Sequence, residues 1–237
     1  MTTINLISGP RNISTALMYS FAQRPDTNVL DEPFYSVYLF KTNVSHPGKE
    51  DVLNSLPQTE TEVRSLIHAS KTKSVLFIKN MAHHIEVLEN PFIEECINVF
   101  LIRNPYQIIA SYAEVINAPV MRDIGIEYQY NLYQLLRRSG KKTVVLDSGT
   151  LLKNPQKVLE KLCSSCAIDF DQRMLHWQPG PKSYDGVWAT HWYSNVHQSS
   201  GFEKQKTSER KLPPHLEPLY EKSKRFYEKL LPISLKA

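Results

Sequence analysis

The sequence is poor in cysteine. Cys96, Cys163 and Cys166 are an odd number in 237 residues, which argues against the paired disulfides of small secreted domains. Cys163 and Cys166 form a C-x-x-C, but a second such pair and a nearby histidine are both missing, and the surrounding stretch has the pattern of an amphipathic helix. We therefore interpret these two cysteines as ordinary helix residues rather than as a redox or metal site.

Long apolar runs are also missing. No hydrophobic stretch approaches the length of a membrane span. The apolar segment at residues 4–7 is too short for a signal peptide, and no basic region precedes it. We therefore expect a cytoplasmic protein with no membrane partner.

Charge of one sign is not concentrated anywhere in the chain. The 28 Lys and Arg residues oppose 24 Asp and Glu residues, for a net charge of +4. This surplus is compatible with a small anionic ligand but is too small to indicate DNA or RNA. We expect a small-molecule ligand and no nucleic acid, and the sequence leaves a homo-oligomer open.

Short apolar runs alternate with helical patterns along the chain. Strands are predicted at residues 4–7, 28–30, 75–78, 99–102 and 143–146, and helices at 14–23, 60–70, 105–115, 126–138 and 155–166. Such alternation is typical of right-handed crossovers and a parallel sheet that is covered on both faces. We predict a single α/β domain over residues 1–237, with a central parallel sheet of about five strands flanked by helices.

The last part of the chain departs from this alternation. Residues 178–207 are rich in Pro, Gly, Ser, Trp and Tyr and show little periodicity, which predicts a long ordered loop. Its rings either face a ligand or pack on the core, and the candidates are Trp188, Trp192, Tyr193, His197 and Phe202. A final helix is predicted at residues 214–230.

The loop after the first strand has the features of a phosphate site. Gly9 and Pro10 make the turn, and Ser14 or Thr15 is expected to cap a helix that begins near residue 16. The amides at such a helix start attract anions, and Arg11 adds a full charge. The loop is not a Walker A motif, because it has no second glycine and no lysine.

A second cationic motif follows the strand at residues 99–102. Arg103 stands at the strand end, Pro105 fits the first turn of a helix, and Ser111 lies two turns into that helix. An arginine and a serine placed in this way could hold one more phosphate, although each could instead serve only local structure.

Together the two motifs resemble those of the sulfotransferase family that uses 3′-phosphoadenosine 5′-phosphosulfate (PAPS). The first motif reads P-R-N-I-S-T at residues 10–15, where the family commonly has P-[KR]-S-G-T-T, so Asn12-Ile13 replaces Ser-Gly. The second is R-N-P-x-x-x-x-x-S at residues 103–111, and the strand, turn and helix at residues 143–170 also look like the family's. The resemblance covers roughly residues 4–170 and implies a P-loop NTPase-like sulfotransferase architecture.

The resemblance implies which residues hold PAPS and its product, 3′-phosphoadenosine 5′-phosphate (PAP), and implies no metal. The first motif would hold the 5′-phosphosulfate, and Arg103 and Ser111 would hold the 3′-phosphate. The implied nucleotide-binding residues are Gly9, Pro10, Arg11, Asn12, Ser14, Thr15, Arg103 and Ser111. The family's C-terminal glycine-rich segment has only a candidate equivalent here, at residues 199–202.

The catalytic candidates follow the first three strands. Arg11 would stabilise charge on the leaving phosphate. Glu32 is our first candidate for the base, and His83 and His84 are the second, of which at most one is expected to face the site. Lys79 could contact the transferring group, but each of these residues could also be merely structural.

The function that the resemblance implies is transfer of a sulfuryl group from PAPS to a hydroxyl or amine of a small acceptor. Two other functions are alternatives to it. A kinase or phosphatase could use Arg11, and Asp147 is then the candidate to hold Mg²⁺. A non-catalytic nucleotide-binding module is the third possibility, which the missing glycine in the first loop favours.

Overall fold

The computed structural model describes residues 1–89, 92–203 and 210–237. Its strands are parallel and lie in the order β2-β3-β1-β4-β5. Their bounds are β1 Thr2–Ser8, β2 Thr27–Asp31, β3 Val75–Met81, β4 Ile97–Ile102 and β5 Thr143–Asp147. Each strand lies where the apolar pattern predicts one, so the predicted α/β domain with a five-stranded parallel sheet is confirmed.

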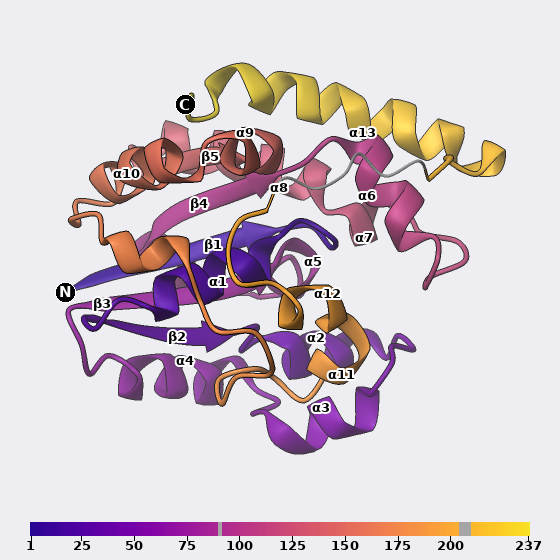
Figure 1. Ribbon diagram of the computed structural model, residues 1–237. Coiled ribbons are helices and arrows are strands. Elements are labelled where there is room, and N and C mark those ends of the chain that lie inside the picture. The colour runs from indigo at the N-terminus through magenta and orange to yellow at the C-terminus, as the bar shows by residue number, and fades with distance from the viewer. Residues whose placement is uncertain (90–91, 204–209) are drawn as a thin grey trace.

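Helices cover both faces of this sheet (Figure 1). The longer ones are α1 Ser14–Ala22, α2 Tyr35–Thr42, α3 Lys49–Ser55, α4 Glu60–Ala69, α6 Pro105–Tyr112, α8 Ile126–Arg138, α10 Pro155–Ser165 and α13 Glu217–Leu230. The shorter ones are α5 Ala82–Ile85, α7 Met121–Ile124, α9 Ser148–Lys153, α11 Ala189–Trp192 and α12 Ser194–His197. Single 3₁₀ turns are η1 Phe92–Glu95, η2 Gln172–Leu175, η3 Pro214–Leu216 and η4 Leu231–Ile233.

Alternate residues of each strand face opposite layers of the core. Val99 and Leu101 of β4 pack with α1 and α10, whereas Phe100 and Ile102 pack with the layer that contains α4, α6 and α8. Both sets of side chains are buried, as expected for strands in a sheet that helices cover on both sides. The two helical layers thus pack on opposite faces of one continuous sheet, and the carboxyl ends of its parallel strands meet at one edge.

A row of buried asparagines crosses the middle of the sheet. The amide of Asn80 donates to Asn5, Asn5 donates to Asn98, and Asn98 donates to the carbonyl of Ile93, at 2.7–2.9 Å. Buried amides are costly unless they are hydrogen-bonded. The row therefore links β3, β1 and β4, the strands that precede the main segments of the site described below.

The helix prediction was incomplete at two places. Residues 35–55 carry α2 and α3, which the sequence pattern did not indicate, and the expected loop at residues 178–207 contains α11 and α12. Residues 204–207 of that loop lie outside the described part. Cys163 and Cys166 are buried free thiols, and burial raises the pKa of Cys163 to about 11 and that of Cys166 to about 12.

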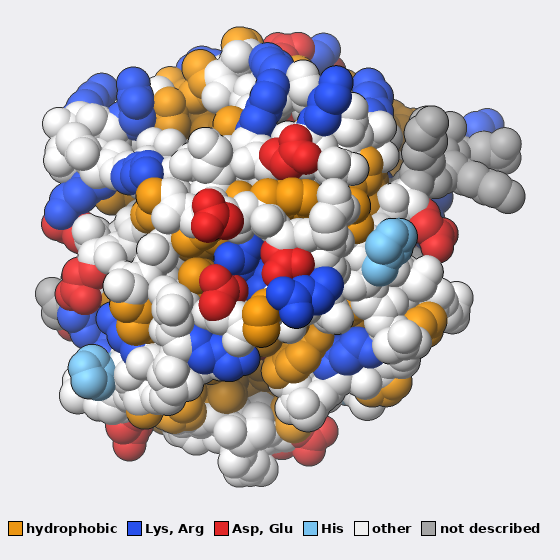
Figure 2. Space-filling model, turned by 60° about the vertical axis from the view of Figure 1, so that its left-hand side comes forward, with side chains coloured by type: hydrophobic (Ala, Val, Ile, Leu, Met, Phe, Trp, Pro, Cys, Tyr) orange, Lys and Arg blue, Asp and Glu red, His pale blue; other side chains and the backbone are white. Residues whose placement is uncertain are grey.

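The face drawn in Figure 2 carries charges of both signs. Blue basic side chains are more frequent toward the top of that view, and red acidic ones lie mainly around its centre and rim. This mixture agrees with the small net charge of +4. Among the described residues, no helix is both long and apolar enough to cross a bilayer.

Candidate functional site

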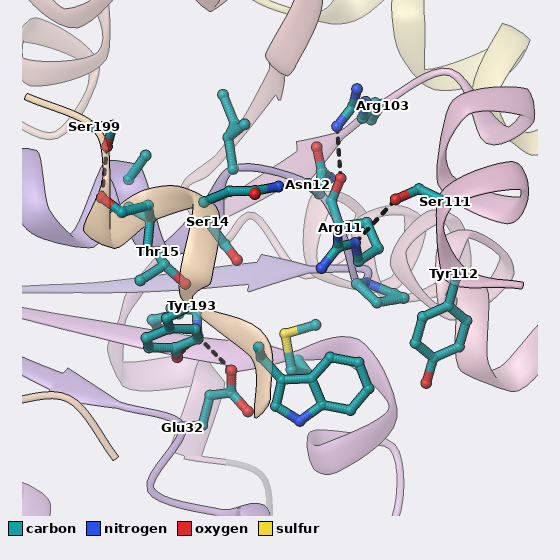
Figure 3. Close-up of a pocket in the computed structure, with 18 of the residues that line it drawn as sticks. Arg11, Asn12, Ser14, Thr15, Glu32, Arg103, Ser111, Tyr112, Tyr193 and Ser199 are labelled. Carbon is teal, nitrogen blue, oxygen red and sulfur yellow. Dashed lines mark hydrogen bonds and ion pairs between the residues drawn. The ribbon is translucent and has the colours of Figure 1, made fainter. Parts of the chain in front are cut away.

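One cavity of about 600 Å³ lies at the edge of the sheet where the parallel strands end. Its walls come from the segments that follow β1, β2, β3 and β4, together with residues 188–203 (Figure 3). In α/β sheets ligands bind outside the carboxyl ends of the strands. The cavity therefore stands where the fold predicts a ligand site.

The loop after β1 leads into α1 without a side-chain cap. Helix α1 begins at Ser14, and its N-cap is Ile13, whose side chain makes no capping hydrogen bond. The expectation that Ser14 or Thr15 caps the helix is therefore wrong, because both residues already lie inside the first turn. Both line the cavity. The first-turn amides of α1, which carry partial positive charge, are consequently not engaged by a capping side chain.

Strained backbone is concentrated at this cavity. Arg11, Ile13 and Glu32 have φ values of 55°, 50° and 43°, in the left-handed region. For a β-branched residue such as Ile13 this conformation is a genuine outlier, and such strain persists only where the surrounding structure enforces it. The loop thus adopts a left-handed turn at the position where the resembling family has glycine.

The other members of the predicted loop have separate tasks. Asn12 is buried, lines the cavity and donates to the carbonyl of Leu101 in β4 at 2.6 Å, which ties the loop to the sheet. Pro10 also lines the cavity. Gly9 serves packing instead, since a Cβ there would collide with the carbonyl oxygen of Ile124.

We call the part of the cavity formed by Arg11, Arg103, Ser111 and Arg210 the arginine end. Nε of Arg11 donates to Oγ of Ser111 at 3.0 Å, and Nη1 of Arg103 donates to the carbonyl of Arg11 at 2.7 Å (Figure 3). Burial, and then the neighbouring guanidinium of Arg210, lower the pKa of Arg11. Burial, Arg11 and Arg210 lower that of Arg103. Arg11 and Arg103, whose guanidinium groups repel each other beside the start of α1, form a receptor for an anion with more than one charge, and Arg210 beside them is paired with Glu114 at 2.6 Å.

The predicted partners at the arginine end are therefore brought together, but in a different pairing. Ser111 was expected to act with Arg103, and in the structure it accepts from Arg11. Arg103 instead also donates to Oε1 of Gln107 at 3.0 Å. Arg210 is an addition that the sequence did not indicate, because it stands about a hundred residues after this motif and in no recognisable pattern.

We call the opposite part the aromatic end, and define it by its lining residues: Glu32, Tyr35, Lys79, His83, His84, Trp188, Trp192 and Tyr193. At its base lies a buried network. Lys79 of β3 donates to Asp31 at 2.8 Å, to Glu32 and to the hydroxyl of Tyr193 at 2.7 Å. The hydroxyl of Tyr193 in turn donates to Asp31 at 2.7 Å.

This network changes the interpretation of Lys79. An ammonium group has three donors, and Asp31, Glu32 and Tyr193 accept all three. Burial by itself would lower the pKa of Lys79, but Asp31 and Glu32 raise it above its ordinary value. Lys79 is thus a fixed counter-charge for the two carboxylates, and no donor remains for the transferring group that we expected it to contact.

Glu32 is the carboxylate of this network that reaches the cavity. Burial, the largest cause, raises the pKa of its carboxyl to about 7, although Lys79 opposes the shift. Its second oxygen, Oε2, lies 3.6 Å from Nδ1 of His84. A carboxylate with a pKa near neutrality can take and return a proton at that pH, so the position predicted for a base has the matching acidity.

Both histidines line the cavity, so the expectation that at most one would face it is wrong. They lie in the single turn α5 directly after β3. Burial lowers the pKa of His83 to about 3 and that of His84 well below 6.5. Nδ1 of each is buried and has no hydrogen-bond partner among the described residues. Both rings are therefore neutral, and each keeps an enclosed nitrogen without a partner among the described residues.

The aromatic segment lines the cavity through some of its rings. Trp188, Trp192, Tyr193 and Phe202 line it, as do Ser199 and Gly201 of the candidate glycine-rich segment. His197 does not point there, because its Nε2 bonds to Asp185 at 3.0 Å. Asp31 holds this segment in place by accepting from Tyr193 and, at 3.1 Å, from the amide of Gly186. In the sequence, the only indication that Asp31 has this positioning role is its place directly before Glu32.

Asp147 does not face the cavity. Its carboxylate caps α9 by accepting from the amide of Thr150 at 2.8 Å, and it also accepts from the hydroxyl of Tyr227 at 3.1 Å. The carboxylate that a kinase would use to hold Mg²⁺ instead connects the end of β5 to α9 and α13 by hydrogen bonds.

Solved sulfotransferase structures share this fold. The sulfotransferase domain of the olefin synthase of Synechococcus PCC 7002 covers 94% of both chains with a TM-score of 0.56 at 18% identity. A sulfotransferase domain of the curacin biosynthetic pathway covers 100% of this chain and 99% of its own, with a TM-score of 0.59 at 15% identity. Mouse sulfotransferase SULT7A1, complexed with PAP, covers 97% of this chain and 82% of its own, with a TM-score of 0.55 at 12% identity.

Sequence comparison gives longer relatives and a family. The chain is 35% identical over 222 residues to "Branched-chain-amino-acid aminotransferase-like protein 1" of Arabidopsis thaliana, a match that covers 93% of this chain and 40% of that protein. The chain thus spans well under half of that relative's length. The family model described as "Sulfotransferase domain" matches residues 1–228. The chain belongs to the sulfotransferase domain family.

Proposed function

We propose that the protein is a PAPS-dependent sulfotransferase that moves a sulfuryl group from PAPS to a hydroxyl or amine of a small acceptor. The observation that carries the proposal is the single cavity that joins the arginine end to the carboxylate of Glu32. One end suits a nucleotide with several phosphate charges, and the other suits a group that must lose a proton.

The arginine end has the chemistry that PAPS requires. Its 5′-phosphosulfate would lie at the uncapped start of α1, against Arg11 and the first-turn amides of Ser14 and Thr15. Its 3′-phosphate would lie against Arg103 and Ser111. The bond from Arg11 to Ser111 supports a shared role, because it makes the two phosphate subsites neighbours.

The chain's own residues then supply the chemistry of transfer. The acceptor oxygen forms a bond to sulfur while the bond from sulfur to the 5′-phosphate oxygen breaks, and PAP departs with that electron pair. Glu32 accepts the proton of the attacking group. Arg11 stabilises the charge that develops on the departing phosphate, and Lys79 holds Glu32 in place.

Binding of PAP in the absence of metal tests the donor site. We expect PAP to bind at least about tenfold more tightly than AMP, which lacks the 3′-phosphate, because charge-assisted bonds to a phosphate contribute about 1.5–3 kcal/mol. Arg103→Ala should remove this preference while AMP binding stays nearly unchanged. Isothermal titration calorimetry measures all three affinities.

A matched variant separates loss of the site from general loss of charge. Arg173→Ala removes an exposed arginine that pairs with Asp171 outside the cavity, and it should bind PAP as the wild type does. Thermal melting of Arg103→Ala checks that the loop after β1 keeps its fold. Equal affinity of the wild type for PAP and AMP would contradict the proposal.

A further inference from the structure

The two ends of the cavity differ in the sign of their charge. Arg11, Arg103 and Arg210 line the arginine end. At the aromatic end, Asp31 and Glu32 face one ammonium group, that of Lys79. The base of the aromatic end therefore holds one carboxylate more than it holds cations.

The surrounding residues do not cancel this surplus. Arg122, whose guanidinium lies near Tyr38, is paired with Glu86 at 2.9 Å. The carboxylate of Asp123 accepts a hydrogen bond from the amide of Val120 at 2.8 Å, and it lies close enough to His46 in the cavity wall to interact with it electrostatically. The aromatic end is therefore negative when Glu32 is ionised, which requires a pH near or above its pKa of about 7.

The histidines of the aromatic end add no positive charge. His83 and His84 are neutral for the reason given above, and burial also lowers the pKa of His46, the third imidazole in the wall. Neutral imidazole can accept a hydrogen bond from an alcohol. Nδ1 of His84 lies 3.6 Å from Oε2 of Glu32 but is enclosed, so the carboxylate of Glu32, which lines the cavity, is the acceptor for a hydroxyl group.

Aromatic rings make up the rest of this wall. Tyr35 stacks on His84 with ring centroids 4.3 Å apart and meets Trp188 edge to face at 5.3 Å. Trp192 stacks on Tyr112 at 6.3 Å. Electron-rich ring faces beside a carboxylate attract cations, and ammonium groups are commonly recognised in this way.

From these features we propose that the acceptor is a small alcohol that carries a fixed positive charge, an ammonium or quaternary ammonium group a few bonds from its hydroxyl. The hydroxyl lies against the carboxylate of Glu32, and the cation lies against the rings of Tyr35, Trp188 and Trp192. An anionic acceptor is repelled by Glu32 and Asp31. This inference rests on the proposed function, because it assigns the acceptor of that reaction.

Three alcohols of similar shape test the charge directly. Choline carries a trimethylammonium group, 3,3-dimethyl-1-butanol replaces it with a neutral tert-butyl group, and hydroxypivalate carries a carboxylate. With PAP-saturated protein in the calorimeter, we expect choline to bind at least about tenfold more tightly than the neutral alcohol. Hydroxypivalate should not bind, and rates of sulfation with PAPS should follow the same order.

Two variants locate the preference. Glu32→Gln should bring the affinities of choline and its neutral isostere to within about threefold, because it removes the surplus charge and keeps the shape. Trp192→Leu should reduce the preference without changing PAP affinity, since the leucine keeps an apolar wall but removes a ring face.

The outcomes separate the two proposals. If PAP does not bind, the proposed function itself fails. If PAP binds and the neutral or anionic alcohol binds as well as choline, or none of the three binds, the donor site stands and the inference about the acceptor is overturned.

Discussion

Replacing Glu32 with glutamine is expected to lower the turnover of acceptor with PAPS by about 10²–10⁴-fold, the usual contribution of a positioned general base. Glutamine keeps the size of the side chain and one oxygen, but it cannot take the acceptor proton. PAP affinity should stay close to that of the wild type, because Glu32 lies at the aromatic end and not at the arginine end. Initial rates and PAP calorimetry on the same preparation measure both effects.

The pH profile distinguishes a base from a residue that only supports the fold. The base must be ionised, and burial raises the pKa of Glu32 to about 7. Wild-type kcat/KM should therefore rise with pH, level off above about pH 7, and fall about tenfold per unit below it. Glu32→Gln should lose this limb. Glu160→Gln, which removes a carboxylate that bonds to Gln156 on α10, should keep the wild-type profile. A Glu32→Gln enzyme with full activity would refute the assignment.

Lys79→Met is expected to destabilise the protein by about 3–5 kcal/mol, the range seen when one partner of a buried ion pair is removed. Methionine fills a similar volume, but Asp31 and Glu32 are then left buried without their ammonium group. For a chain of this size, such a loss corresponds to a fall in melting temperature of about 10 °C. Calorimetry or circular dichroism at pH 8 measures it.

A surface lysine with a matching arrangement is the control. Lys41 also pairs with two carboxylates, Glu60 at 2.7 Å and Glu89 at 3.3 Å, but its side chain is 31% exposed. Lys41→Met should cost at most about 1 kcal/mol. If the two variants lost equal free energy of unfolding, the buried network would contribute no more to stability than a surface ion pair does.

The cost of Lys79→Met should also depend on pH. The folded-state pKa of Glu32 is already raised above its ordinary value, and loss of the ammonium raises it further. The folded state then binds more protons than the unfolded state, so stability falls as pH rises through this range. The destabilisation should be smaller at pH 5 than at pH 8, and the opposite order would contradict the charge argument.

The regular elements of the fold could be predicted because they depend on local pattern. Buried parallel strands are continuous apolar runs, and even the short run at residues 28–30 proved to lie in β2, which pairs with β3 in a register that sets Asp31 beside Lys79. Helices α2 and α3 escaped prediction because residues 35–55 have mixed polarity, and tertiary packing of residues such as Tyr38 and Val52 decides their conformation.

By itself, the sequence determined the alternation of strands and helices, the two cationic motifs and the candidates Glu32, His83 and His84, since each depends on residues close together in the chain. Only the tertiary structure decided which residues pair: Arg11 with Ser111, and Lys79 with Asp31, Glu32 and Tyr193. It also placed Arg210 in the wall of the cavity. Those contacts join segments up to about two hundred residues apart. The sign of charge at each end of the cavity, and the burial that raises the pKa of Glu32, exist only once these segments have packed together, because both depend on distance in space and exclusion of water.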